Sequence, residues 1–182
     1  MSSIQKSETQ IYDKDIHLFD KTSMLKNIKE LNIANKIHFF CELKNVDGKK
    51  KPYGLPVNWT CLTQSSIRTN QNAIIIRTGE DNDLTIVDFD DIEQYREVYN
   101  QIRKLKVDTS QFYVVKSGKG YHWYFNYTDQ LKTGNSIIPD VEIKNNKASI
   151  NGYGSWHPVA QKYYTLNQGN ILDLPDMPQE LI

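Results

Sequence analysis

Alternating and helical patterns of hydrophobic residues divide most of the chain into strands and helices. Two runs of β-branched residues, Ala73 to Gly79 and Leu84 to Asp90, flank a charged turn and predict a pair of adjacent strands. From Ile92 the apolar residues recur at helical spacing, which predicts a helix that runs to Lys106. Asp91 stands at the N-cap position of this helix, so we expect its role to be structural.

The same patterns predict elements on both sides of this region. After the helix, aromatic and β-branched residues predict strands over residues 111–115 and 121–125, and alternation predicts another up to Lys144. Before residue 72 we expect a helix over residues 23–31, a strand over residues 37–43, a turn at Asp47-Gly48 and a short helix over residues 65–70.

Two aspartates close the second β-branched run and face the same way. Side chains alternate along a strand, so Asp88 and Asp90 share one face while Val87 and Phe89 share the other. Two carboxylates this close repel each other unless a cation lies between them, and oxygen ligands suit Mg²⁺ or Mn²⁺. The alternative is an ordinary strand that ends in an acidic turn.

A turn with two glycines, Ser117 to Gly120, connects two of the predicted strands. Its backbone N–H groups, the Ser117 hydroxyl and the Lys119 ammonium could all face a phosphate. In the strand that follows, alternating aromatic residues form one apolar face, so His122 points to the opposite side. A lone histidine on a strand is often structural, but this one is directed to the side on which the aspartates are expected.

The last predicted strand also presents acids to one face. Asp140, Glu142 and Lys144 alternate with Val141 and Ile143. A half-buried surface strand would give the same alternation. This pattern therefore indicates a site only together with the two motifs described above.

In this order, the three motifs resemble those of the primase-polymerase branch of the archaeo-eukaryotic primase superfamily. The family has an Asp-hydrophobic-Asp strand, a Ser-Gly-rich turn followed by His, and a strand acid before a basic residue. The likeness extends upstream to Lys51-Pro52 and to Arg77-Thr78-Gly79, and downstream through a Gly- and Tyr-rich segment to about residue 167.

The resemblance implies a nucleotidyltransferase, a DNA primase and polymerase that copies single-stranded DNA from NTPs or dNTPs. It implies two divalent ions, Mg²⁺ or Mn²⁺, held by Asp88, Asp90 and Glu142, with Asp140 as second choice for the third ligand. These three acids and His122 would form the catalytic set. The nucleotide phosphates would contact Ser117, Lys119 and His122, with Arg77 and Lys144 as further contacts.

The chain departs from the family pattern at two points. Aligning Ile143-Lys144 with the family's Ile-Arg pair favours Glu142 over Asp140 as the metal ligand. Lys144 has the same charge as that Arg but lacks its planar guanidinium group. Family members commonly carry a zinc-binding element, but Cys41 and Cys61 have no paired spacing, so no structural zinc is expected.

Charge limits how tightly this chain is expected to bind DNA. The 22 basic and 22 acidic residues cancel, which predicts weak, salt-dependent binding of single strands. Lys49, Lys50 and Lys51 form a local basic cluster that could guide template, although charge runs of this kind more often form a solvated loop, and that is the interpretation we favour. No apolar run has the length of a membrane span and no signal-peptide core is evident, so we expect an intracellular protein, cytoplasmic or at a site of viral or plasmid replication.

The fold expected is α+β in one primase-polymerase domain over residues 1–182. A small amino-terminal αβ module, to about residue 80, would be followed by a module with a sheet similar to an RNA-recognition motif over residues 81–182, with the active cleft between them. The segment from Leu172 to Pro178 resembles the seam at which larger relatives continue into a helicase, which implies a helicase domain or partner.

Two other classes of protein fit part of the pattern. A metal-dependent nucleotide-sugar glycosyltransferase also uses Asp-x-Asp, but it gives no reason for the Ser-Gly turn and His122. A non-catalytic nucleic-acid-binding module would use the same sheet, with aromatic residues on its open face.

Overall fold

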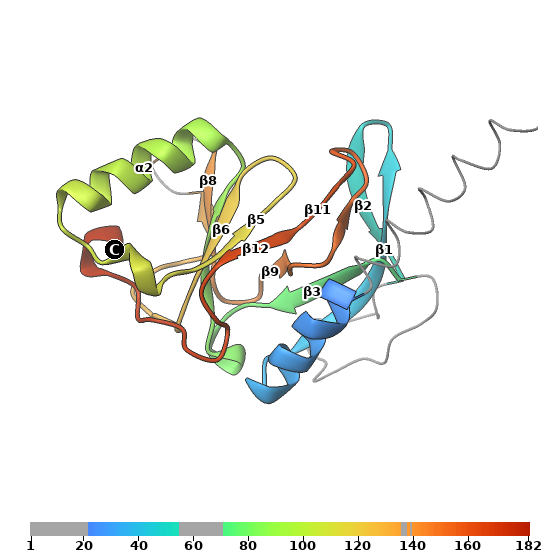
Figure 1. The fold of residues 1–182 in the computed structure, drawn as a ribbon, viewed down its shortest axis with the longest axis horizontal. Helices are drawn as coiled ribbons and strands as arrows, with labels where there is room; N and C mark the ends of the chain where they lie inside the picture. The colour runs from blue at the N-terminus through green and yellow to red at the C-terminus, as the bar shows by residue number, and fades with distance from the viewer. Residues whose placement is uncertain (1–21, 55–70, 136–137, 139) are drawn as a thin grey trace, which may run out of the picture.

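The computed structural model describes residues 22–54, 71–135, 138 and 140–182 of the 182-residue chain. Within these residues the fold is α+β, with two helices and antiparallel sheets of four, six and two strands (Figure 1). The first helix covers residues 22–33 and confirms the helix expected there, while α2 spans Ile92–Lys104. Helix α2 covers one side of the six-stranded sheet, and the four-stranded sheet lies on the other side (Figure 1).

The strands of the two larger sheets are interleaved in sequence. The four-stranded sheet has the order β2 (Lys49–Tyr53), β1 (His38–Val46), β3 (Ala73–Arg77) and β9 (Ser149–Asn151). The six-stranded sheet has the order β12 (Thr165–Gln168), β5 (Tyr113–Lys116), β6 (Tyr121–Phe125), β4 (Thr85–Phe89), β8 (Val141–Lys144) and β7 (Gly134–Asn135). A hairpin of β10 (Trp156–His157) and β11 (Lys162–Tyr163) forms the third sheet. Because β9 pairs with β3, the four-stranded sheet includes a strand from the second half of the chain.

The two β-branched runs do not form a pair of adjacent strands, and that prediction was wrong. Strand β3 belongs to the four-stranded sheet and β4 to the six-stranded sheet, and only a single bridge joins Gly79 to Leu84 between them. The backbone is left-handed at Gly79, with φ of 117°, and at Asp83, with φ of 45°. These two positions turn the chain out of one sheet and into the next.

A tight hairpin confirms the turn expected at Asp47-Gly48. Strands β1 and β2 pair directly on either side of these two residues, with Val46 opposite Lys49. Both turn residues have positive φ, 53° at Asp47 and 74° at Gly48, as a type I′ turn requires.

Helix α2 begins as expected but ends earlier. The Asp91 carboxylate accepts hydrogen bonds from the backbone N–H of Glu93 at 2.8 Å and of Gln94 at 3.1 Å, which confirms it as the N-cap. The helix ends at Lys104 and not at Lys106, because the backbone of Lys106 is left-handed with φ of 63°. Leu105, expected on the apolar face, is 58% exposed as a result.

The six-stranded sheet buries apolar side chains on both faces. Beneath α2, Phe89 and Trp123 pack with Val98 and Ile102 of the helix. On the other face Ile86, Tyr124 and neighbouring residues pack against the four-stranded sheet and the helix over residues 22–33. The alternation along β4 and β6 is therefore the one that the sequence predicts.

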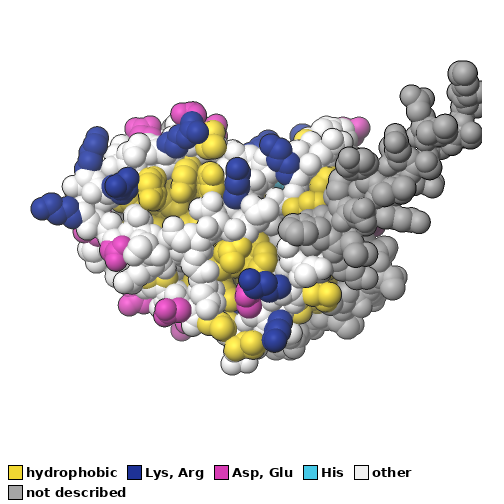
Figure 2. Space-filling model, in the orientation of Figure 1, with side chains coloured by type: hydrophobic (Ala, Val, Ile, Leu, Met, Phe, Trp, Pro, Cys, Tyr) yellow, Lys and Arg dark blue, Asp and Glu magenta, His cyan; other side chains and the backbone are white. Residues whose placement is uncertain are grey.

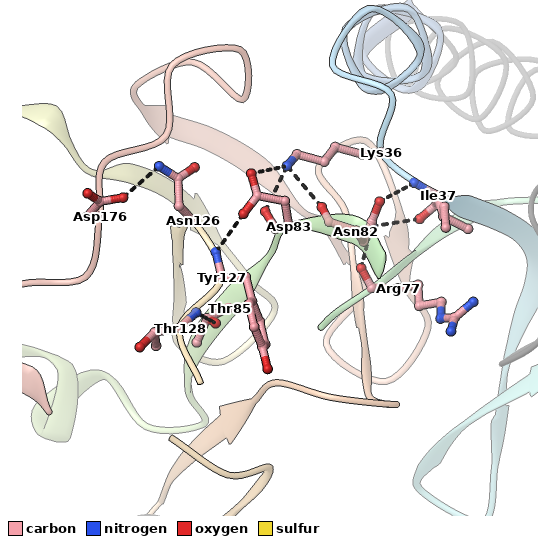
Figure 3. A network of polar contacts seen from close by, with 10 residues as sticks. All are labelled: Lys36, Ile37, Arg77, Asn82, Asp83, Thr85, Asn126, Tyr127, Thr128 and Asp176. Carbon is pink, nitrogen blue, oxygen red and sulfur yellow. Dashed lines mark hydrogen bonds and ion pairs between the residues drawn. The ribbon is translucent and has the colours of Figure 1, made fainter. Parts of the chain in front are cut away.

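A polar network fastens the β3–β4 connection to its surroundings (Figure 3). The Lys36 ammonium donates to the backbone carbonyls of Asn82 at 3.0 Å and Asp83 at 2.8 Å. The Asn82 side chain bonds both backbone groups of Ile37, and the Asp83 carboxylate accepts from the N–H of Tyr127 at 3.1 Å. The place where the chain passes between the sheets is thus held by buried and half-buried hydrogen bonds.

The remaining expectations concern the two cysteines, a short helix and membrane spans. Cys61 and the short helix expected over residues 65–70 lie outside the described residues. Cys41 is buried in β1, and burial raises the pKa of its thiol to about 12. Among the helices that the structure describes, none combines the length and the apolarity needed to cross a membrane.

Candidate active site

Three neighbouring strands bring the principal predicted residues side by side. In the β4–β6 and β4–β8 pairs, Asp88 lies directly opposite His122 on one side and Glu142 on the other. The His122 Nε2 atom is 3.3 Å from Asp88 Oδ1. Strand geometry therefore places two acids and an imidazole in one row across the sheet, on the face away from α2.

A cavity of about 270 Å³ opens onto this row. One wall comes from the six-stranded sheet and its loops, with the predicted residues Asp88, Asp90, Ser117, Lys119, His122 and Lys144. The opposite wall comes from the four-stranded sheet and the tail, with Lys50, Asn151, His157 and Tyr164 among its polar residues. The cavity is thus a polar, charged space between the two sheets, of a size that holds a small anionic molecule.

Burial disfavours negative charge at the two aspartates. Asp88 is 12% exposed, and its pKa is raised to about 6 by burial, although the charges of Lys144 and Lys50 oppose the shift. The pKa of Asp90 is also raised, first by burial and then by the charge of Asp88. A largely buried carboxylate, Asp88, beside the exposed carboxylate of Asp90 is a site at which a cation binds favourably.

His122 is neutral near pH 7, so its contact with Asp88 is not an ion pair. The ring is 3% exposed, and burial followed by the charge of Lys50 lowers its pKa to about 3. The Nδ1 atom has no hydrogen-bond partner among the described residues. With Asp88 as the acceptor beside Nε2, the imidazole acts as a hydrogen-bond donor at that atom and as an unused acceptor at Nδ1.

The glycines of the Ser117–Gly120 turn are needed for packing. A Cβ on Gly120 would lie 1.9 Å from the carbonyl oxygen of Phe89, and one on Gly118 would lie 2.6 Å from the His157 ring. The Ser117 Oγ atom accepts from the backbone N–H of Gly120 at 2.9 Å, which leaves its own O–H free to donate. Close approach to β4 and to His157 therefore fixes this turn at the edge of the cavity.

Several predicted residues do not reach the cavity. Arg77 pairs with Asp81 at 2.5 Å. Asp140 is exposed, precedes β8 and has a left-handed backbone with φ of 57°, so the expected alternation starts only at Val141. Lys49 and Lys51 are exposed on β2. Glu142 shares the row with Asp88, but its carboxylate is 2.6 Å from the Lys144 ammonium and does not line the cavity.

Sequence reasoning gave no site role to His157 and Tyr164, which the fold brings to the cavity. The His157 ring lies 5.9 Å from the Tyr164 ring, and the Tyr164 ring lies 5.6 Å from that of His122. Burial lowers the pKa of His157, and its Nδ1 atom accepts from the N–H of Ala160 at 3.0 Å. Both residues fall in the Gly- and Tyr-rich segment, but no local pattern distinguishes them from core residues.

The donor chemistry of the site suits a hard divalent cation. Asp88 and Asp90 contribute carboxylate oxygens to the cavity wall, and these are the ligands that Mg²⁺ and Mn²⁺ prefer. As the described side chains are arranged, no three His, Cys, Asp or Glu residues surround a common point, because Glu142 is held by Lys144. The residues fit an ion by their chemistry, and Glu142 would join the other two by leaving Lys144.

The surface around the site carries both signs of charge. On the face that Figure 2 shows, Lys and Arg side chains of the described residues are scattered among Asp and Glu and do not merge into one patch. An apolar patch lies beneath α2 on the same face (Figures 1 and 2). This distribution agrees with the formal net charge of zero.

Comparison with known proteins gives one family. The family model described as bifunctional DNA primase/polymerase, N-terminal (Prim-Pol) matches residues 44–180, which include every motif discussed above. Among curated proteins none matches the chain. Since the match covers most of the sequence, this chain belongs to the bifunctional DNA primase/polymerase N-terminal family.

Proposed function

We propose that this domain is a template-dependent nucleotidyltransferase that makes or extends primers on single-stranded DNA. The observation that carries the proposal is the row Glu142, Asp88 and His122, in register on three adjacent strands and next to a charged cavity. Membership of the primase/polymerase family implies DNA and nucleotides as substrates.

The phosphates of an incoming NTP or dNTP would lie against the Ser117–Gly120 turn. The Ser117 hydroxyl has its hydrogen free to donate, and the Lys119 ammonium lines the same wall. His122 is neutral, so it would contribute no charge, and its N–H would donate to a phosphate oxygen only after leaving Asp88. Lys144 would reach the phosphates once Glu142 releases it, while Arg77 would have to leave Asp81 to take part.

Asp88, Asp90 and Glu142 would hold two divalent cations, Mg²⁺ or Mn²⁺. When bound, such ions supply the positive charge that activates the 3′-hydroxyl of the primer and neutralises the triphosphate. The raised pKa values of both aspartates support this assignment, because a nearby cation would offset the desolvation of the Asp88 carboxylate and the repulsion that the Asp88 charge exerts on the exposed Asp90.

The reaction would be an in-line transfer in which the protein forms no covalent bond. The 3′-hydroxyl oxygen bonds to the α-phosphorus, its proton leaves, and the bond to the bridging oxygen breaks to release pyrophosphate. Ser117, Lys119 and His122 would position the phosphates, and the cavity walls would restrict water. Catalysis would therefore come from positioning and charge.

Template binding is proposed to be weak and to fall steeply with salt. The net charge is zero and the basic side chains are scattered, so few phosphates would be neutralised at once. Such a domain needs a tether to its template, and a helicase domain or partner would provide one. We further propose that residues 1–182 act as one catalytic domain.

Primer extension in the presence of Mn²⁺ tests the proposal. Replacing Asp88 and Asp90 together with Ala is expected to reduce incorporation of labelled nucleotides to the assay background, with thermal unfolding still cooperative. A double Ala variant of Asp129 and Asp173, which are both exposed and change the charge equally, is the control and should extend primers normally. Undiminished synthesis by the first variant would refute the assignment, and binding without turnover by the unmodified protein would favour a non-catalytic module.

A further inference from the structure

One lysine of the basic cluster differs from its two neighbours. Lys49, Lys50 and Lys51 are successive residues of β2, which pairs with β1 at the edge of the four-stranded sheet. Side chains alternate along the strand, so Lys49 and Lys51 are exposed while Lys50 is partly buried and lines the cavity. The cluster therefore divides into two surface lysines and one that faces Asp88 and Asp90 across the site.

Lys50 lacks the acidic partner that a buried ammonium usually has. Its Nζ atom donates to the Tyr164 hydroxyl at 2.7 Å and lies 5.4 Å from the centre of the Tyr164 ring. Within the described part of the chain no carboxylate lies at ion-pair distance from this atom, whereas Lys144 pairs with Glu142 at 2.6 Å. A partly buried cation whose hydrogen-bond partner is a neutral hydroxyl is a position that an anion would stabilise.

The surroundings fix where this ammonium points. The Tyr164 hydroxyl accepts a hydrogen bond from the Lys50 ammonium and lies 3.4 Å from the Asn151 amide nitrogen. Burial raises the pKa of Tyr164, which keeps this hydroxyl neutral. Tyr164 also contacts the rings of His122 and His157. Lys50 is thus held in place by a residue that is itself packed into the site.

The positive charge of Lys50 shifts the pKa values of several titratable groups that line the cavity. It lowers the pKa of Asp88, and after burial it is the largest cause that lowers the pKa of His122 and of His157. Of the lysines that line the cavity, Lys144 is paired with acids, so Lys50 and Lys119 provide the unpaired positive charge, one from each wall.

We propose that Lys50, held by Tyr164, binds a phosphate oxygen of the incoming nucleotide from the wall opposite the Ser117–Gly120 turn. The ligand class is a polyphosphate oxyanion, and its identity as a nucleotide rests on the proposed function. A template phosphate has the same chemistry, but Lys50 lines the same cavity as Ser117 and Lys119, while Lys49 and Lys51 are exposed and do not line it. Nucleotide binding would in this way draw on both sheets, with Tyr164 as a positioning residue.

Calorimetric titration with a dNTP, with tripolyphosphate and with single-stranded DNA, each alone, tests the proposal. Lys50→Met keeps the length of the side chain but removes its charge, and it is expected to weaken dNTP and tripolyphosphate binding about 10- to 100-fold. Lys104→Met, which removes the same charge at an exposed position at the end of α2, should bind both as the unmodified protein does. Equal affinities of the Lys50→Met and unmodified proteins for both polyphosphates would overturn the inference, and so would a loss confined to single-stranded DNA.

Tyr164→Phe separates positioning from direct binding. It should weaken dNTP binding in the unmodified background but add nothing to Lys50→Met, because the hydroxyl acts through the ammonium. Additive losses would overturn that part of the inference. If the unmodified, folded protein binds no dNTP at all, the proposed function itself fails, which is a result distinct from equal binding by the variant. Cooperative thermal unfolding of each variant shows that it is folded.

Discussion

The two faces of the six-stranded sheet are built from the same strands but differ in what they do for the protein. Trp123 and His122 are neighbours on β6 and are almost equally buried, at 0% and 3% exposed. The Trp123 ring packs edge-on against Phe89 at 4.6 Å and Phe112 at 5.3 Å. His122 instead meets Asp88, Tyr124 and Tyr164.

This difference shows that burial alone does not tell whether a side chain stabilises the fold. On the α2 face, burial removes apolar surface from water and favours folding. On the cavity face, burial raises the pKa of Asp88 and leaves the Lys50 ammonium with a neutral partner, both of which oppose folding. We infer that apolar packing, beneath α2 and in the part of the opposite face around Ile86 and Tyr124, supplies the stability that offsets these unfavourable charges.

The largest expected effect is the loss of stability on truncating the α2 face. Trp123→Ala removes a fully buried ring from a cluster of aromatic residues, so the free energy of unfolding should fall by about 3–5 kcal/mol. Urea denaturation followed by circular dichroism measures it. His122→Ala, one residue away, should lose less than half as much, because the cavity lets water replace the imidazole. Equal losses would mean that the two faces contribute alike.

The second expected effect has the opposite sign. Burial raises the pKa of Asp88 from 3.8 to about 6 in the folded protein, so its contribution to stability is fully present below pH 4 and is lost as the pH rises through 6. In metal-free buffer at pH 8, Asp88→Asn should therefore be more stable than the unmodified protein, by on the order of 2–3 kcal/mol.

Denaturation of both proteins between pH 4 and pH 8 measures this effect. The two free energies of unfolding should converge toward pH 4, where Asp88 is protonated in the folded protein and begins to be protonated in the unfolded chain. Adding Mn²⁺ at pH 8 should stabilise the unmodified protein and leave Asp88→Asn unaffected, which serves as the control. A difference that stays constant with pH would show that the carboxylate is not destabilised by burial.

The two faces also differ in how well they could be predicted from sequence. A strand repeats every two residues, so the opposite orientation of His122 and Trp123, and the common face of Asp88 and Asp90, follow from local pattern. Their register across three strands does not, because it depends on which strands pair. Local pattern shows three successive lysines after the Asp47-Gly48 turn but predicted no strand there, and only the docking of the two sheets shows that Lys50 is the one that reaches the cavity.

Two incorrect predictions, the start of β8 and the pairing of the two β-branched runs, have local causes that the hydrophobic pattern does not reveal. Alternation was extended back to Asp140, but its left-handed backbone lies before the start of β8. The two β-branched runs were paired because a short turn separates them, yet the left-handed residues Gly79 and Asp83 send β4 into another sheet. In both cases backbone conformation at one or two residues overrides side-chain periodicity.

The third expected effect concerns the Ser117–Gly120 turn, which connects β5 to β6 at the edge of the cavity. In Gly120→Ala the new Cβ would clash with the Phe89 carbonyl, so the turn must move away from β4. We expect a loss of about 1–3 kcal/mol and, because Ser117 and Lys119 move with the turn, a greater loss of primer extension. Gly48→Ala, in the β1–β2 hairpin, has open space around it but a positive φ and should cost about 1 kcal/mol with normal extension. Normal extension by Gly120→Ala would show that the turn need not touch β4.

The smallest expected effect tests whether the boundary between stability and chemistry falls between Asp90 and Asp91. Asp90 lines the cavity, whereas the Asp91 carboxylate accepts from the N–H groups of Glu93 and Gln94 at the start of α2. Asp91→Ala should therefore lower the free energy of unfolding by about 1 kcal/mol and leave the rate of primer extension unchanged at a temperature where the protein is folded. Asp91→Asn retains a capping oxygen and should match the unmodified protein in both measurements. If both variants lost extension while their stability was unchanged, Asp91 would belong to the site, and the division of the sheet into a stabilising face and a reactive face would have to be redrawn one residue further along the chain.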